Sequence, residues 1–317
     1  MSKKKKSLKR RLKHFWARIK RRRKILIPIL LIILIALILS VTISRNNSGK
    51  TMPDVDDSTV DEIIAEENRE KLPMEGQVCV CFGDSITGNT EPPNDYPSVL
   101  ARETGMKVIN LGFGGSRMSV HPYPEYDAFS MYRLVDAIVT KNYDLQEANK
   151  TNEAIASVAD KKLRSLKGID WEEVDYITLC YGANDIQQWG NPIDNPDNPL
   201  DTSTFLGAYR YTIERIKLEY PHIKVIVMTP LYRYWEDSME TSDEQIIQDV
   251  PYTAWVDRVI EVAIEYNVHC IDLYKLPGFN KSNSNLYYQT DGVHPNHDGL
   301  RVVGKIISNE MIKQYVK

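Results

Sequence analysis

The sequence predicts an α/β fold with a parallel sheet for residues 76–317. Short strand-like runs alternate with helix-like segments along this stretch. The strand-like runs are apolar on both faces, which is typical of parallel strands buried between two layers of helices. These observations favour one α/β domain with a sheet of about five strands.

Five runs have the length and composition of strands. In chain order they are residues 77–82, 107–110, 175–180, 224–228 and 268–273. Five segments have helical character: residues 97–104, 152–167, 204–219, 253–266 and 297–315. Segment 204–219 places its apolar residues mostly on one face, as an amphipathic helix requires. Residues 117–150 form an unusually long connection, which we expect to be an insertion near the functional site.

A basic tail and an apolar run precede this domain. Residues 1–50 hold sixteen Lys and Arg and no acidic residue, so the net charge of −3 is the balance of +16 there and −19 in the rest. Residues 25–43 are uncharged and would span about 28 Å as a helix, close to the hydrocarbon thickness of a bilayer. We predict a cytoplasmic tail at 1–24, a transmembrane helix at 25–43 and a polar, acidic linker at 44–75. A short helix from Thr59 to Lys71 is compatible with that linker.

The positive-inside rule places such a basic tail in the cytoplasm and the domain outside the cell, anchored to the cell membrane by one pass. A cleaved signal peptide is the alternative, but its apolar core is normally shorter and ends at small residues. The sequence after residue 39, "SVTISRNN", has no A-x-A pattern. A basic run also suits nucleic acid, but beside an apolar span anionic lipid headgroups explain it better.

Candidate chemistry follows the predicted strands at their carboxyl ends, where open parallel sheets form their ligand crevice. The four stretches read "GDSIT" from residue 83, "LGFGGSRM" from 111, "YGANDIQQW" from 181 and "DGVHPN" from 291. They supply a serine, a glycine-rich loop, an asparagine and an Asp-x-x-His. Those are the parts of an acyl-transfer site.

Each part has a mechanical role in such a site. Ser85 would be the nucleophile and His294 the base that takes its proton. Asp291 would accept the other imidazole N–H and fix the tautomer. The tetrahedral oxyanion needs preorganised donors, which the N–H groups of Ser85 and Gly115 and the side-chain amide of Asn184 would supply.

The four blocks resemble the GDSL, or SGNH, hydrolase family, which is named for one Ser, Gly, Asn and His in separate blocks. Here the blocks read "GDSIT", "NLGFGGS", "GAND" and "DGVH", in the family's order. Ile86 replaces the commoner Leu. Gly114 and Gly115 both fit the second block, and counting from Asn110 favours Gly115. The resemblance implies a flavodoxin-like three-layer sandwich and ester hydrolysis without a metal or other cofactor.

The loops near the predicted crevice are rich in aromatic residues, which suit stacking on sugar rings but equally suit loop packing. They are Tyr96, Tyr123, Tyr126, Trp189, Tyr232, Tyr234 and Trp235. For substrate contacts we select Asp84, Asp185 and Trp189. The surface location and these loops favour an acetyl or other small acyl ester on a surface glycan. A lysophospholipase or thioesterase is an alternative, as is a non-catalytic glycan-binding module on the same fold.

Two other kinds of site are weakly supported. The "GFGG" stretch suggests a dinucleotide loop, but Arg117 stands where the third glycine would be and no acidic residue ends a following strand. His294, His297, Asp291 and Asp298 could suggest a metal site, but a further set of firm ligands is missing. The sequence therefore predicts no metal, no cofactor and no nucleic-acid partner.

The four cysteines, Cys79, Cys81, Cys180 and Cys270, lie in or beside predicted strands. Their spacing does not fit a zinc or thioredoxin motif. We expect small apolar core residues, although a disulfide is possible outside the cell.

Overall fold

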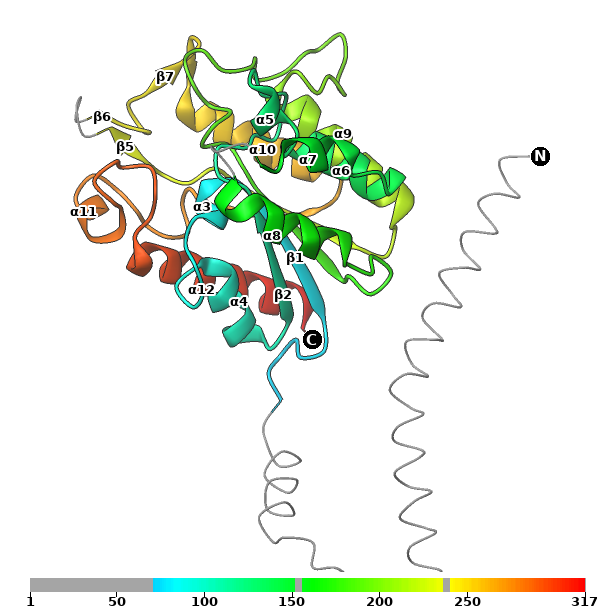
Figure 1. Ribbon diagram of the computed structural model, residues 1–317. Helices are drawn as coiled ribbons and strands as arrows, with labels where there is room; N and C mark the ends of the chain where they lie inside the picture. Colours follow the sequence, from blue (N-terminus) through cyan, green and yellow to red (C-terminus); the bar gives the residue numbers. More distant parts are fainter. Residues whose placement is uncertain (1–70, 152–155, 236–239, 317) are drawn as a thin grey trace, which may run out of the picture. The chain divides into compact units, whose positions relative to one another are not determined.

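The computed structural model describes residues 71–151, 156–235 and 240–316. A five-stranded parallel sheet forms its centre (Figure 1). In spatial order the strands are β2 (Lys107–Gly112), β1 (Val78–Gly83), β3 (Tyr176–Cys180), β4 (Lys224–Met228) and β9 (His269–Ile271). All four neighbouring pairs run parallel. The predicted α/β class and the strand number are therefore confirmed.

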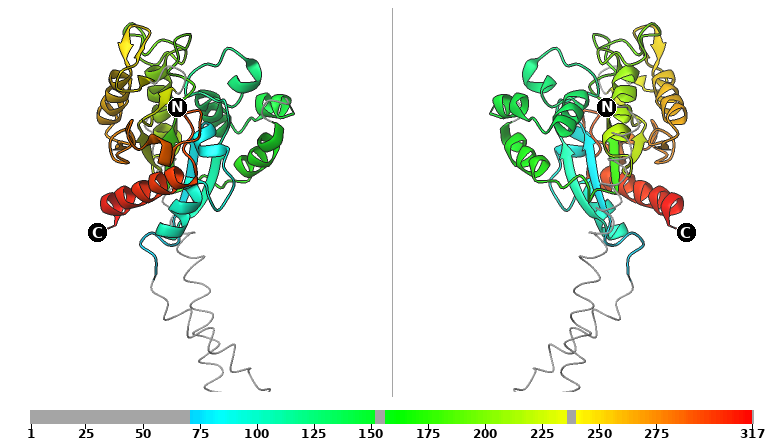
Figure 2. Two further views of the ribbon diagram at one scale, coloured as in Figure 1. Left: turned by 90° about the vertical axis from the view of Figure 1, so that its left-hand side faces the viewer. Right: turned by 90° about the vertical axis from the view of Figure 1, so that its right-hand side faces the viewer.

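Helices flank the sheet in two groups. Helix α4 (Tyr96–Thr104) packs against α12 (His297–Tyr315), whereas α9 (Phe205–Glu219) packs against α6 (Met131–Thr140) and α10 (Tyr252–Glu265). The views in Figure 2 show the sheet lying between helical layers. This is the three-layer sandwich that the resemblance implied.

Helix α8 (Ala156–Lys167) precedes β3 and packs beside β2. The remaining elements are short and lie mainly in the connections. They are α3 (Ser85–Gly88), α5 (Pro124–Asp127), α7 (Asp144–Asn149) and α11 (Ser284–Tyr287), with the hairpins β5 (Tyr234–Trp235)–β6 (Glu240–Thr241) and β7 (Ile246–Ile247)–β8 (Val250–Pro251).

The long connection at 117–150 is more ordered than its sequence indicated. It contains α5, α6 and α7, and α6 buries Met131, Leu134, Val135 and Ile138. The apolar residues of α6 recur at helical spacing, so their period alone predicts this helix. The connection therefore contributes a layer helix as well as loops.

The predicted tail, transmembrane helix and most of the linker, including the segment from Thr59, lie outside the described residues. Among the helices that are described, none has the length and apolar character needed to cross a membrane. The prediction for 25–43 therefore stays a prediction.

Candidate active site

Ser85 stands at the point where β1 gives way to a helix. The strand ends at Gly83, and Asp84 caps α3 by accepting the Ile86 N–H on its carboxylate at 3.0 Å. The cap directs the chain into a helix immediately after the strand, so Ser85 occupies the first helical position at the carboxyl edge of the sheet. Its own backbone N–H has no partner among the described residues.

Asp291 and His294 approach Ser85 from the loop before α12. Gly292 has φ +67°, which suits glycine and closes a tight turn. Through this turn the N–H groups of Val293 and His294 both donate to Asp291 Oδ1 at 2.9 Å. The His294 ring is bonded on both sides: Nδ1 lies 2.6 Å from Asp291 Oδ2, and Nε2 lies 2.8 Å from Ser85 Oγ.

The electrostatics of this chain of contacts favour a charged Asp291. Burial alone would raise the pKa of Asp291, but the backbone and ring of His294 and the Val293 N–H outweigh it, and the pKa is lowered. An ionised Asp291 accepts the Nδ1 proton, which leaves Nε2 free to accept from the Ser85 hydroxyl.

The glycine-rich loop and Asn184 lie next to one another. The Ser116 N–H closes a turn on Phe113 O at 3.1 Å, and Gly115 occupies its third position with φ +77°. Asn184 Nδ2 donates to Ser116 O at 2.9 Å. The Gly115 N–H has no partner among the described residues. A Cβ on Gly115 would clash with the Tyr126 ring, so glycine is required for space as well as for φ.

The three residues selected for substrate contacts differ in exposure. Asp185 is buried, and its carboxylate accepts from the N–H of Met118 and from the N–H and Oγ of Ser119. It holds that loop and leaves no exposed oxygen for a substrate. Asp84 is also buried, as the cap of α3. Trp189, by contrast, is 94% exposed.

Burial raises the pKa of Asp84 to about 7, and the nearby Asp185 adds to the rise. The Ile86 N–H and the charge of His294 oppose it. A carboxyl group directly beside the candidate nucleophile is therefore close to half protonated near neutral pH.

The expected aromatic lining is only partly present. Tyr96 belongs to α4 and is buried, and Tyr232 is buried as well. Their side chains serve packing, the alternative noted above, because the helix or loop that carries them faces the core. Tyr123 is 59% exposed, and Tyr126 lies against Gly115.

The four cysteines and His297 lie in places where they serve the fold. All four cysteines are free, and Cys79 and Cys81 lie 4.0 Å apart at Sγ on the same strand.

Asn296 caps α12 by accepting from Asp298 and Gly299 N–H groups, so His297 is the first residue of that helix. No cluster of three or more His, Cys, Asp or Glu suited to a metal ion occurs within residues 71–151, 156–235 and 240–316.

Two basic residues near the site were not selected from the sequence. Lys162 of α8 donates to Gly88 O at 2.9 Å and to Gly112 O, and so ties the end of α3 to the end of β2. Burial lowers the pKa of Lys162 to about 8. Arg117 directly follows Ser116 and is 8% exposed. For Arg117 a signal was present, because a cation follows a glycine-rich loop at a strand end.

The parallel sheet, its helical layers and the side chains gathered at its carboxyl edge define an α/β protein of the SGNH-hydrolase fold. The sequence matches the GDSL-like lipase/acylhydrolase family over residues 81–302, and the chain belongs to that family. This family membership supports an ester hydrolase.

Two of the solved structures that this chain resembles, each with a TM-score above 0.5, agree with the fold. One superposes with a TM-score of 0.58 at 23% identity, covering 77% of this chain and 100% of its own. A protein from Lactobacillus plantarum has a TM-score of 0.54 at 17% identity, covering 76% of this chain and 99% of its own. A possible lipase from Chitinophaga pinensis DSM 2588 has a TM-score of 0.49 at 17% identity, with the same coverage. A sequence search among curated proteins found no match.

Proposed function

We propose that this protein is a membrane-anchored, extracellular serine esterase that removes small acyl groups, foremost acetyl, from a surface glycan. The observation that carries the proposal is the unbroken contact from Asp291 through the His294 ring to Ser85 Oγ. In this scheme His294 Nε2 takes the hydroxyl proton as Ser85 Oγ attacks the ester carbonyl. His294 then returns that proton to the departing alcohol, and a water repeats the sequence to release the acid.

The oxyanion of each tetrahedral intermediate would meet donors that the fold leaves free. The N–H groups of Ser85 and Gly115 make no hydrogen bond among the described residues. The Asn184 side chain is oriented by its bond to Ser116 O, which leaves one amide hydrogen for the oxyanion. Donors fixed before the reaction need no reorganisation as the charge develops.

A small acyl group is favoured by the composition of the loops beside the site. Residues 121–129 and 186–199 contain no run of Leu, Ile or Val that could line a continuous apolar channel. A long acyl chain gains free energy from burial only in such a channel. The exposed rings of Trp189 and Tyr123 support a sugar as the acyl-bearing partner.

Two measurements test the reaction itself. A fluorophosphonate probe should label the full-length protein in detergent at Ser85, located by peptide mapping, and should not label Ser85→Ala. Aryl esters of two to ten acyl carbons, used below their micelle concentrations, should be cleaved with a kcat/KM that is highest at two carbons. A rate that climbs steadily to ten carbons would instead favour the lysophospholipase or thioesterase alternative. Absence of both labelling and hydrolysis would favour the glycan-binding module.

The proposed location rests on the uncharged run 25–43 and the basic residues before it. Protease added to intact cells should digest the domain and protect only a short N-terminal fragment. Protection of the whole chain would contradict an outward-facing domain. A mature N-terminus near Arg45 would show cleavage in place of anchoring.

A further inference from the structure

Arg117 is a nearly buried cation whose side chain has no partner in the described part of the chain. Its side chain makes no hydrogen bond and no ion pair among the described residues, and its Nε is buried without an acceptor. The two Nη atoms likewise have no acceptor, yet they are not among the buried unsatisfied atoms, so the outer edge of the guanidinium reaches solvent. Burying a guanidinium without an acceptor costs free energy, which a structural role alone does not recover.

The carboxylates around Arg117 are already engaged. Asp185 is close enough for the Arg117 charge to lower its pKa against the rise that burial causes. The oxygens of Asp185, however, accept from Met118 and Ser119. Asp127 is bonded to Tyr132 and Arg133. The guanidinium of Arg117 therefore has no carboxylate bound to it among the residues that the structure describes.

Arg117 also stands beside the proposed oxyanion donors. It directly follows Ser116, whose carbonyl receives Asn184. His121 is near enough for the Arg117 charge to lower its pKa, and its ring is 4.9 Å from that of Tyr126, the ring that abuts Gly115. The Arg117 backbone thus directly follows the glycine-rich loop of the site, and its guanidinium lies near His121 and Asp185.

His121 adds a neutral donor to this edge. Burial lowers the pKa of His121 to about 4, and the charge of Arg117 contributes, although Glu125 and Asp127 oppose the shift. His121 Nδ1 accepts the Tyr123 N–H at 3.1 Å, so the proton of the neutral ring is on Nε2. That N–H has no acceptor among the described residues.

We propose that Arg117, assisted by the Nε2–H of His121, forms an anion-binding subsite that receives a carboxylate or phosphate group on the acyl-bearing part of the substrate. The proposal rests on the proposed esterase function and narrows the substrate to an acidic glycan. A guanidinium suits both anions because its paired N–H groups match two oxygens at once. Arg117 is a specificity residue in this scheme and takes no part in bond breaking.

The test compares three acetyl esters of one sugar ring that differ at C6, where the group is neutral, a carboxylate or a phosphate: methyl O-acetyl-glucoside, methyl O-acetyl-glucuronide and methyl O-acetyl-glucoside 6-phosphate. The full-length protein in detergent should prefer the anionic esters by about 10- to 100-fold in kcat/KM. Arg117→Gln should reduce the ratio of anionic to neutral kcat/KM to near one, mainly through KM, and Arg117→Lys should restore part of it. The kcat/KM values of the glucuronide and the 6-phosphate show whether a carboxylate or a phosphate is the better ligand.

A remote charge control separates binding from general electrostatics. Arg102 is an exposed arginine of α4, so Arg102→Gln removes the same charge and should keep the anionic preference. If Arg102→Gln loses the preference as Arg117→Gln does, or if the unsubstituted protein shows none, the subsite is refuted.

A binding measurement keeps the subsite separate from the esterase. Inorganic phosphate and methyl glucuronide should bind Ser85→Ala in calorimetry, and should bind Ser85→Ala/Arg117→Gln about 10-fold or more weakly. Binding without hydrolysis by the unsubstituted protein would support the subsite while refuting the esterase. Hydrolysis of the neutral ester, together with anion binding that does not depend on Arg117, would support the esterase while refuting the subsite.

Discussion

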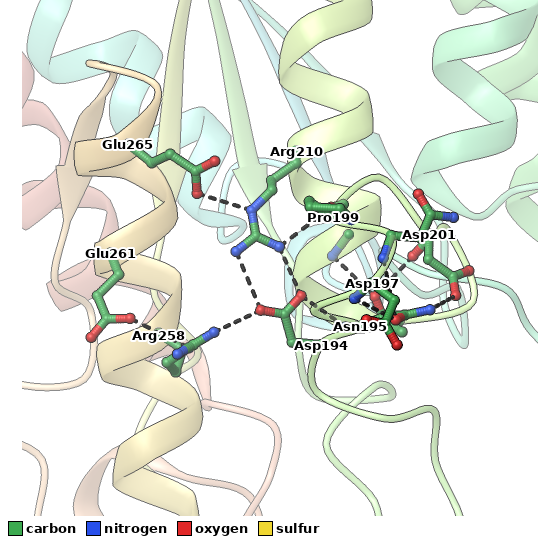
Figure 3. A network of polar contacts seen from close by, with 12 residues as sticks. Asp194, Asn195, Asp197, Pro199, Asp201, Arg210, Arg258, Glu261 and Glu265 are labelled. Atoms are coloured by element: carbon green, nitrogen blue, oxygen red, sulfur yellow. Dashed lines mark hydrogen bonds and ion pairs between the residues drawn. The ribbon is translucent and has the colours of Figure 1, made fainter.

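Two regions of this domain bury arginine side chains to the same extent but satisfy them differently. Arg117, beside the candidate site, and Arg210, on α9, are each 8% exposed. Arg210 donates to Asp194, to Glu265 and to the carbonyl of Pro199, and Arg258 adds a second cation to Asp194 (Figure 3). Arg117 donates to no described residue.

The difference teaches how to separate structural from functional polar groups in this fold. The Arg210 cluster, defined as Asp194, Arg210, Arg258 and Glu265, is internally complete and ties the loop before α9 to α9 and α10. At the candidate site the free groups are donors: the N–H groups of Ser85 and Gly115 and the Arg117 guanidinium. Natural proteins tolerate unsatisfied buried groups mainly where a ligand completes them. Substitutions should therefore cost activity at the site and stability in the cluster.

The largest effect should follow the loss of the candidate nucleophile. Ser85→Ala removes the attacking oxygen, and we expect kcat for an aryl acetate to fall by roughly 10⁴- to 10⁶-fold. His294→Ala should be about as severe, whereas Asp291→Asn should cost less because the carboxylate orients the imidazole without transferring the proton. Steady-state kinetics measures the loss, and urea unfolding should show little change for Ser85→Ala. Retention of most activity by Ser85→Ala would mean that another group attacks.

The second-largest effect should be a loss of stability when the Arg210 cluster is broken. Arg210→Met leaves the largely buried Asp194 with Arg258 as its remaining cation and removes the partner of the half-exposed Glu265, so we expect the free energy of unfolding to fall by about 2 kcal/mol. Urea unfolding measures this, and kcat of the folded fraction should stay close to that of the unsubstituted protein.

Arg117→Met is the matched control, because it removes an equally buried arginine whose side chain bonds to no described residue. Its free energy of unfolding should change by less than about 1 kcal/mol, in either direction. An equal loss for both variants would mean that Arg117 has a structural partner, and the contrast between the two regions would fail.

The third prediction compares how one carboxylate from each region makes the stability of the protein depend on pH. The pKa of Asp84 is raised to about 7 by burial, whereas that of Asp194 is lowered because the bonds from Arg210 and Arg258 outweigh its burial. Folded Asp84 therefore holds its proton up to about pH 7, while the unfolded chain loses it near pH 4. Between these values the folded state binds more protons, so Asp84 reduces stability as pH rises.

Asp84→Asn should remove the loss of stability that Asp84 causes as pH rises. Relative to the unsubstituted protein, this variant should gain stability from pH 4 to 7, by at most about 1.4 kcal/mol per pH unit. Asp194 contributes stability that is lost as pH falls, so the cost of Asp194→Asn should shrink at acid pH. Urea unfolding at four pH values distinguishes the two, and parallel pH profiles for both variants would contradict the assigned shifts.

The sequence predicted the sheet closely because strands buried on both faces are apolar without interruption. It also predicted which loops meet, since parallel strands bring their carboxyl ends to one edge. It could not predict which polar groups are satisfied. Asp185 looked available beside Asn184, but Ser119, distant in the chain, binds its carboxylate. From the sequence, Arg117 is only a residue that breaks a dinucleotide pattern, because the satisfaction of its guanidinium depends on the folded surroundings.

The smallest effect concerns the loop that joins the two regions. Residues 186–199 begin beside Asn184, where Arg233 donates to Ile186 O, and reach the Arg210 cluster at Asp194. Between these anchors Gln248 Nε2 donates to the carbonyls of Gln187 and Asn191. A loop held at three points presents Trp189 to solvent in a fixed place, which lowers the entropic cost of stacking on a sugar ring.

Stacking of this kind contributes on the order of 1 kcal/mol, so Trp189→Ala should lower kcat/KM for an acetylated polysaccharide about 3- to 10-fold relative to that for an aryl acetate. Stability should not change, because the ring is 94% exposed and packs on little of the protein. Ile264→Ala is the matched control: this residue is also a large exposed apolar side chain, but it lies on α10. If both variants lower the ratio equally, or neither does, Trp189 is not part of a glycan site. The glycan would then be recognised at the Arg117 edge alone.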